Sequence, residues 1–190
     1  MEAAGRDGAA LAEGNDPDLT NRPSIKREEC RSGRGDYVVR RTLSTITRVA
    51  PDLIASAELT IDTPGEGFLD ITSDVRDFVS RAGAQSGLVT LFLRHTSASL
   101  TIQENADPDV LRDLVTALRH LAPRDFGWIH DAEGPDDMPA HVRTMLTGVS
   151  LQIPLLHGRL QLGTWQGIYL VEHRTRPHRR QLILQCIGAR

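Results

Sequence analysis

Hydrophobic positions divide the chain into a polar N-terminal stretch and a patterned body. Residues 1–35 contain few large apolar side chains and no periodicity, and Gly, Asp, Glu and Arg fill much of the stretch. Such a segment cannot bury enough apolar surface to offset the entropy lost on ordering. We therefore predict a disordered N-terminal extension over 1–35 and one folded domain over 36–190.

Short runs of β-branched or alternating apolar residues predict strands throughout the body. The run at 88–94 is almost wholly apolar, as in a central strand, whereas the run at 97–103 alternates. The predicted strands are 37–47, 55–62, 88–94, 97–103, 149–154, 159–163, 166–172 and 180–187.

Three segments carry apolar residues at helical spacing. The clearest begins at Asp107, which can cap the first turn, and Pro108 follows where its missing N–H costs nothing. Gly83 and Gly148 favour the C-terminal ends of the other two. Strands at both ends with helices between them predict an α+β domain with a largely antiparallel or mixed sheet. The predicted helices are 73–83, 107–123 and 137–147.

Composition excludes several classes of function. The net charge of −3 and pI of about 6.2 argue against a nucleic-acid partner. No apolar run is long enough to span a membrane and no signal-peptide pattern is present, so we expect a cytoplasmic protein. The only lysine, Lys26, lies in the extension, so the body offers none for a Schiff base or a P-loop. Cys186 lies in an apolar strand pattern and is predicted to be a core residue rather than a nucleophile.

The residues best suited to metal binding or proton transfer lie between positions 95 and 141, where three histidines occur among carboxylates. His95 directly follows an apolar strand, His130 opens a loop, and His141 lies one turn into a predicted helix. Each histidine alone is more often structural, and the spacing matches neither HExxH nor a zinc finger. Together they indicate either a metal site or acid–base chemistry near neutral pH.

Polar residues beside these histidines are candidates for the same site. Thr96 and Ser97 can bind an oxyanion or can simply open a strand. Glu104 and Asn105 lie between a strand and the long helix, and Glu133 lies in the loop of His130. We take Glu104, Asn105 and Glu133 as candidate catalytic residues.

The second concentration is GTWQGIYLVEHR, residues 163–174. Strand alternation places Glu172 on an otherwise apolar face, where an unpaired carboxylate is costly to bury. Glu172 therefore needs either an arginine, with Arg174 and Arg179 as candidates, or a bound ligand, which would make it catalytic. Trp165 can stack on a flat ring or cover the core, and Gln166 follows it.

Several of these strings resemble the YjbQ-like family, an uncharacterised conserved family whose members are also described as secondary thiamine-phosphate synthases. The resemblance rests on SASLTIQENADPDV, EGPDDMPAHV, LTGVSLQIPLLHGRLQLGTWQGIYLVEHR and RRQLILQCIG, and it covers about residues 37–190. The GRL…LGTWQ segment is its most specific part.

The resemblance implies a homotrimeric α+β domain with a pocket near the subunit interfaces, in which His95, His130 and His141 surround a divalent metal. The implied reaction joins a hydroxymethylpyrimidine pyrophosphate to a thiazole phosphate and releases pyrophosphate. Thr96, Ser97, Trp165, Gln166 and Arg174 are then the candidate substrate-binding residues. Carboxylates suit Mg²⁺, whereas three histidines suit Zn²⁺ or Ni²⁺ better, and Mn²⁺ accepts both ligand types. A metal-dependent hydrolase of a phosphorylated or acyl substrate, and a non-catalytic ligand-binding trimer, are the alternatives.

Overall fold

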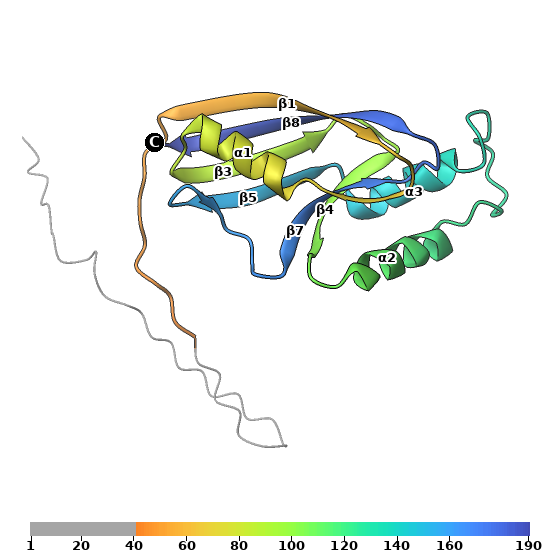
Figure 1. Cartoon of the computed structure of the whole chain (residues 1–190), viewed down its shortest axis with the longest axis horizontal. Helices are drawn as coiled ribbons and strands as arrows, with labels where there is room; N and C mark the ends of the chain where they lie inside the picture. The colour runs from red at the N-terminus through yellow and green to blue at the C-terminus, as the bar shows by residue number, and fades with distance from the viewer. Residues whose placement is uncertain (1–40) are drawn as a thin grey trace, which may run out of the picture. The chain divides into compact units, whose positions relative to one another are not determined.

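The computed structural model describes residues 41–190, and Val49–Arg190 form one compact unit. Figure 1 shows α1 lying across β8 and β3, and α2 near α3 toward the right-hand end. In chain order the elements are β1 (Leu53–Thr63), β2 (Gly67–Asp70), α1 (Thr72–Ala82), β3 (Ser86–Leu93), β4 (Ala98–Glu104), α2 (Pro108–Leu121), α3 (Asp137–Thr147), β5 (Ser150–Leu156), β6 (Arg159–Leu160), β7 (Gln166–Glu172) and β8 (His178–Ala189).

The strands form two sheets, and every pairing within them is antiparallel. The larger sheet has the order β1-β8-β3-β5-β6 and the smaller one β2-β7-β4. The α+β prediction is therefore confirmed. In the smaller sheet, Glu104 of β4 pairs with Gln166 of β7, and Ala98 pairs with Glu172 at the opposite end of the ladder.

One hydrophobic core joins both sheets to α1. Val75 and Phe78 of α1 pack in the same cluster as strand residues from each sheet. Gly83 ends α1 in the left-handed conformation, with its N–H bonded to the carbonyls of Val79 and Ser80. Cys186 is a fully buried free thiol in this core, as predicted, and burial raises its pKa.

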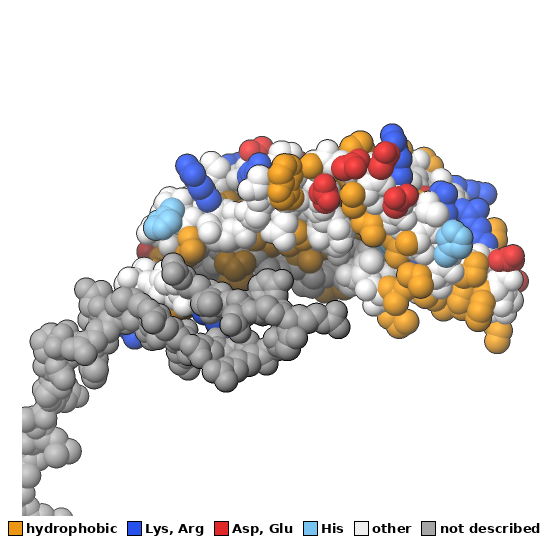
Figure 2. Space-filling model, turned by 90° about the horizontal axis from the view of Figure 1, so that it is seen from below, with side chains coloured by type: hydrophobic (Ala, Val, Ile, Leu, Met, Phe, Trp, Pro, Cys, Tyr) orange, Lys and Arg blue, Asp and Glu red, His pale blue; other side chains and the backbone are white. Residues whose placement is uncertain are grey.

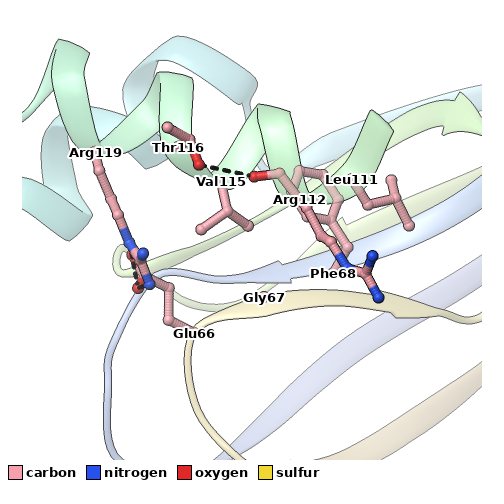
Figure 3. A pocket seen from close by; sticks show the side chains of 8 residues that line it. All are labelled: Glu66, Gly67, Phe68, Leu111, Arg112, Val115, Thr116 and Arg119. Atoms are coloured by element: carbon pink, nitrogen blue, oxygen red, sulfur yellow. Dashed lines mark hydrogen bonds and ion pairs between the residues drawn. The ribbon is translucent and has the colours of Figure 1, made fainter. Parts of the chain in front are cut away.

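Helix α2 contributes no residue to this hydrophobic core. Its sequence is strongly amphipathic, yet none of its residues is fully buried. Leu111 and Val115 instead face Phe68 of β2 across a groove, as Figure 3 shows. The apolar stripe predicted for this helix is present, but it is only half covered within one chain. Among the described residues, no helix is long and apolar enough to cross a membrane.

The outer surface of the five-stranded sheet also exposes apolar side chains. Ile187 of β8 lies opposite Ile54 of β1 and Leu88 of β3, and all three are exposed. Further exposed apolar side chains lie at the last residue of α2, Leu121, and in the loop after it, at Phe126 and Ile129. Figure 2 shows hydrophobic side chains gathered at the end of the molecule that carries this segment.

Three local predictions differ from the structure. Residues 41–47 of the strand predicted over 37–47 form no regular element, and the rest of that prediction and the extension at 1–35 lie outside the described residues. Strand β2 was not predicted, because four residues beside turn glycines carry too short a pattern. The sequence pattern favours Ser73 as the cap of α1. In the structure, the N–H of Thr72, the first residue of α1, instead donates to the carboxylate of Asp70.

Candidate functional site

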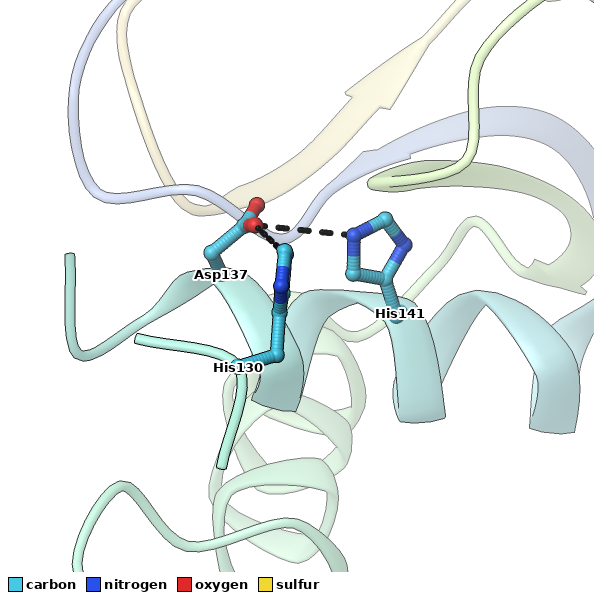
Figure 4. Close-up of side chains that lie close together, drawn as sticks. All are labelled: His130, Asp137 and His141. Atoms are coloured by element: carbon cyan, nitrogen blue, oxygen red, sulfur yellow. Dashed lines mark hydrogen bonds and ion pairs between the residues drawn. The ribbon is translucent and has the colours of Figure 1, made fainter. Parts of the chain in front are cut away.

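Two of the three candidate histidines meet at a buried carboxylate. His130 Nε2 lies 2.8 Å from Asp137 Oδ2, and His141 Nε2 lies 3.5 Å from the same oxygen. One ligand atom from each of the three residues lies within 4.8 Å of the other two. Asp137 and His141 are four residues apart in α3 and therefore share one helix face, and His130 reaches them from the preceding loop, as Figure 4 shows.

A backbone hydrogen bond fixes the orientation and tautomer of His141. His141 Nδ1 lies 2.9 Å from the carbonyl oxygen of Thr96, and a carbonyl can only accept. Nδ1 therefore carries the proton, and in a neutral ring Nε2 has a free lone pair facing Asp137. The lone pair of His141 Nε2 and the carboxylate oxygen of Asp137 repel each other unless a cation or a proton lies between them. Metal-binding histidines commonly have their second nitrogen held in this way.

Arg174 and the residues around it hold the carboxylate of Asp137 in place. The Asp137 side chain is only 3% exposed, and its Oδ1 accepts a hydrogen bond from Arg174 Nη1. Arg174 Nη2 donates to the carbonyl of Glu133 at 2.7 Å, and its Nε lies 3.4 Å from Asp136 Oδ2. These contacts use the guanidinium to position Asp137. Substrate binding by Arg174, as predicted from sequence, would have to use the remaining N–H groups of a side chain that is only 10% exposed.

Asp136 stabilises the loop that leads out of β7. Its Oδ2 accepts hydrogen bonds from the backbone N–H and the hydroxyl of Thr175. Burial would raise the pKa of Asp136, but the two bonds from Thr175 and the charge of Arg174 outweigh this and lower it to about 2. Asp136 therefore remains ionised and connects α3 to the Arg174 segment.

His95 is not part of this group. Its Nε2 accepts a hydrogen bond from the backbone N–H of Gln181 at 2.9 Å. Burial and the neighbouring Arg180 lower the pKa of His95, which favours the neutral ring. Thr96 and Ser97 contribute their backbone carbonyls, to His141 and to Arg180. The structure thus replaces His95 with Asp137 as the third residue of the cluster.

Glu172 takes part in a buried ion pair. Its carboxylate accepts two hydrogen bonds from Arg180, at 2.7 and 2.6 Å, and one from the Thr63 hydroxyl at 2.8 Å. Burial opposes ionisation, but these bonds outweigh it and lower the pKa of Glu172. The predicted arginine partner is therefore present, but it is Arg180, whereas Arg179 pairs with Asp62 and Arg174 contributes its backbone N–H. Catalysis by Glu172 would require it to leave this pair.

Four other candidate residues lie at the opposite end of the β4–β7 ladder. Asn105 Nδ2 donates to the carbonyl of Gln166 at 3.4 Å, and Asn105 N–H donates to the carbonyl of Trp165. Glu104 is half-buried, and Trp165 is 65% exposed. Six residue steps separate the two ends of this ladder, which is about 20 Å. One chain therefore does not bring these residues to the histidines.

A buried serine–histidine pair was not predicted. Ser99 Oγ lies 2.8 Å from His173 Nε2 and accepts a hydrogen bond from the Thr147 hydroxyl at 2.6 Å. Burial lowers the pKa of His173 to about 4. Both residues are inaccessible to a substrate, so the contacts give the pair a structural role between β4, β7 and α3. Nearly every residue of β7 is buried, so alternation of buried and exposed positions could not predict the burial of His173, which follows it.

The histidine cluster is open to a ligand on one side. The side chains of His130 and His141 are 49% and 33% exposed, whereas Asp137 is buried beneath them. Two imidazole nitrogens and one carboxylate oxygen make a donor set that suits Zn²⁺, Ni²⁺ or Mn²⁺ better than Mg²⁺. The Glu133 carboxylate lies beside the cluster, 3.8 Å from Arg174 Nη1, and is largely exposed.

Comparison with known proteins places the whole body of the chain in one family. A family model described as "UPF0047 protein YjbQ-like" matches residues 57–189. The UPF0047 protein sll1880 of Synechocystis is 51% identical over 131 residues, which is 68% of this chain and 89% of that protein. The UPF0047 protein YjbQ of Salmonella typhimurium is 44% identical, covering 68% of this chain and 95% of that protein.

Solved structures agree with this assignment. An uncharacterised conserved protein of the yjbq/upf0047 family from Clostridium acetobutylicum is 39% identical, with a TM-score of 0.65 over 69% of this chain and 99% of that one. A conserved hypothetical protein from Thermus thermophilus is 41% identical, with a TM-score of 0.60 over 67% of this chain and 97% of that one. The chain belongs to the YjbQ-like UPF0047 family.

Proposed function

We propose that this protein is a metal-dependent enzyme that acts on a small phosphorylated metabolite, with His130, Asp137 and His141 as the metal ligands. The observation that carries the proposal is the hydrogen bond from His141 Nδ1 to the Thr96 carbonyl. This bond places Nε2 toward the carboxylate that His130 also contacts, and in the neutral ring this nitrogen is available to bind a metal. The three ligand atoms then surround one position suited to a divalent ion.

Each residue has a definite part in this proposal. Arg174 holds Asp137 so that Oδ2 faces the histidines. His130, on a loop and half-exposed, can exchange the proton shared with Asp137 for the metal. Glu133, whose exposed carboxylate lies 3.8 Å from Arg174 Nη1, is the candidate general acid or base. A bound divalent ion would supply a Lewis acid for phosphoryl oxygens.

Two reactions fit this description. The first is the transfer that the family resemblance implies, in which a hydroxymethylpyrimidine pyrophosphate is joined to a thiazole phosphate. The second is hydrolysis of another phosphorylated or acyl substrate, which the nitrogen-rich donor set favours. Transfer with pyrophosphate release is more often assisted by Mg²⁺ and oxygen ligands. The metal requirement therefore distinguishes the two reactions.

We also propose that the protein is a homotrimer in which the two ends of the β4–β7 ladder meet between copies. Glu104, Asn105, Trp165 and Gln166 lie too far from the histidines to share a substrate within one chain. The exposed apolar face formed by Ile54, Leu88 and Ile187, and the half-covered stripe of α2, support self-association. Light scattering of the full chain should give the mass of a trimer, and a monomer mass would contradict this part of the proposal.

The activity is tested with protein loaded separately with Zn²⁺, Ni²⁺, Mn²⁺ or Mg²⁺. Each form is assayed with the pyrimidine pyrophosphate and thiazole phosphate pair, and with a panel of phosphoesters. We expect turnover in at least one assay that His130→Ala abolishes and the neighbouring loop variant Asp131→Ala retains. Tight metabolite binding without turnover in any form would instead favour the non-catalytic alternative.

A further inference from the structure

Two arginines share the carboxylate of Glu66 on the side of α3 away from the histidines, and Arg124 lines the same cavity as both. Arg119 Nε and Nη2 donate to Glu66 Oε2, at 3.0 and 2.5 Å, and Arg143 Nη1 donates to Glu66 Oε1 at 2.6 Å. Arg124 carries no ion pair or hydrogen bond to any described residue, and Arg143 is buried. Arg143 follows His141 by two residues, which places it about 200° around the helix. This group is therefore separate from the candidate metal centre.

A cavity opens at these arginines. It has a volume of about 450 Å³ and is lined by Arg119, Pro123, Arg124 and Arg143. Glu66, which lines the neighbouring groove rather than this cavity, supplies one negative charge against the three arginines. Among the described residues, Arg119 Nη1 and the guanidinium of Arg124 have no hydrogen-bond partner, whereas Arg143 is fixed by Glu66 and by the carbonyl of Ala122. The cavity is thus a positively charged site with unused N–H donors in the described part of the chain.

The pKa shifts in this group agree with an excess of positive charge. Burial lowers the pKa of Arg143, the pair with Glu66 opposes the effect, and the charges of Arg124 and Arg119 add to it. Burial would raise the pKa of Glu66, but Arg119 and Arg143 outweigh this and lower it. A second anion near the arginines would relieve the remaining repulsion.

An apolar groove lies on the other side of Arg119. It has a volume of about 390 Å³, and Phe68, Leu111 and Val115 line it together with Glu66 and Arg119. Figure 3 shows Arg119 reaching down to Glu66 at one end of this groove. Because Arg119 lines both spaces, a ligand held by Arg119 has apolar surface beside it.

We infer that this region is a second ligand site, in which Arg119 and Arg124 bind the phosphate group of a small molecule whose apolar part lies along the groove between α2 and β2. Guanidinium groups suit phosphate because their planar N–H donors match its oxygens in pairs. The site lies outside the metal cluster, so it can hold a different molecule or an effector.

Calorimetric titration of the full chain with inorganic phosphate and with phenyl phosphate, in a metal chelator, tests this inference. We expect saturable binding of both and tighter binding of phenyl phosphate. Arg124→Gln should weaken both by at least about tenfold, because charge-assisted hydrogen bonds to phosphate are lost. The matched control is Arg76→Gln, which removes an exposed charge from α1.

Each contrary outcome is informative. Equal affinity in Arg124→Gln and Arg76→Gln, or no saturable binding to the unaltered chain, would overturn the site. Equal affinity for phosphate and phenyl phosphate would overturn the part assigned to the groove. Binding that survives Arg124→Gln but disappears in His130→Ala would place the phosphate at the metal cluster and so also overturn the inference. Arg124→Gln is expected to fold normally, because Arg124 is exposed and makes no hydrogen bond or ion pair with residues 41–190.

Discussion

The two ends of the β4–β7 ladder are built from the same two strands, yet their polar residues are held in different ways. At the Ala98–Glu172 end, buried arginines hold Asp137 and Glu172 through short ion pairs. At the Glu104–Gln166 end, the candidate side chains make few contacts, and Trp165 is mostly exposed. The first end is preorganised for a small ligand or metal. The second presents polar and aromatic side chains that make few contacts with the described residues.

Removing a carboxylate should show this difference most strongly. Glu172→Gln leaves Arg180 buried without its counter-ion, which should lower the free energy of unfolding by about 3–5 kcal/mol. Glu104→Gln, at the other end of the same ladder, should change it by less than about 0.5 kcal/mol. Urea denaturation of both variants measures the two effects. Similar values would mean that the two ends are equally constrained.

Acidification should lower the free energy of unfolding, because His173 is buried. The unfolded chain protonates His173 near its ordinary pKa of 6.5, whereas the folded chain does so only near 4. The unfolded state therefore binds more protons between these values, and stability should fall by up to about 3 kcal/mol as the pH drops from 6.5 to 4. His173→Asn should remove most of this dependence, although it lowers stability at neutral pH. An unchanged pH profile in that variant would contradict the assignment.

The smallest effect is expected at the exposed end. Trp165→Ala should change the free energy of unfolding by less than about 1 kcal/mol in the monomer, because its ring is 65% exposed. Ile168→Ala, three residues along and fully buried, should cost about 2–5 kcal/mol. If Trp165→Ala instead abolishes trimer formation or turnover, the ring has its role between copies or on a substrate. Denaturation and light scattering of the two variants separate these cases.

Local patterns predicted most of the fold. The predicted bounds of β7 and α3 match the structure because turn residues mark their ends, and Asp107 caps α2 as expected. Residues 41–47 of the strand predicted over 37–47 form no regular element, since β propensity alone does not form a strand without a sheet to join.

The candidate site could be predicted only in part. His130 and His141 come together as expected, but the third member is Asp137, which was not among the predicted site residues. Its four-residue spacing from His141 was the available signal. The partner of Glu172 could not be chosen among several nearby arginines, because the choice depends on how β7 and β8 lie against each other in space. The sequence also could not show that Glu104 and Gln166 lie about 20 Å from the other end of the β4–β7 ladder, because residue types alone do not give distances.

The most direct test of the central claim is the metal content of untagged protein, measured by elemental analysis beside three single variants. We predict about one transition metal per chain, lost in His130→Ala and His141→Ala and retained in His95→Ala, whose ring is bonded to the backbone of Gln181. Metal lost equally in all three variants would restore His95 as a ligand. No metal in the unaltered protein after incubation with Zn²⁺, Ni²⁺ or Mn²⁺ would contradict the account.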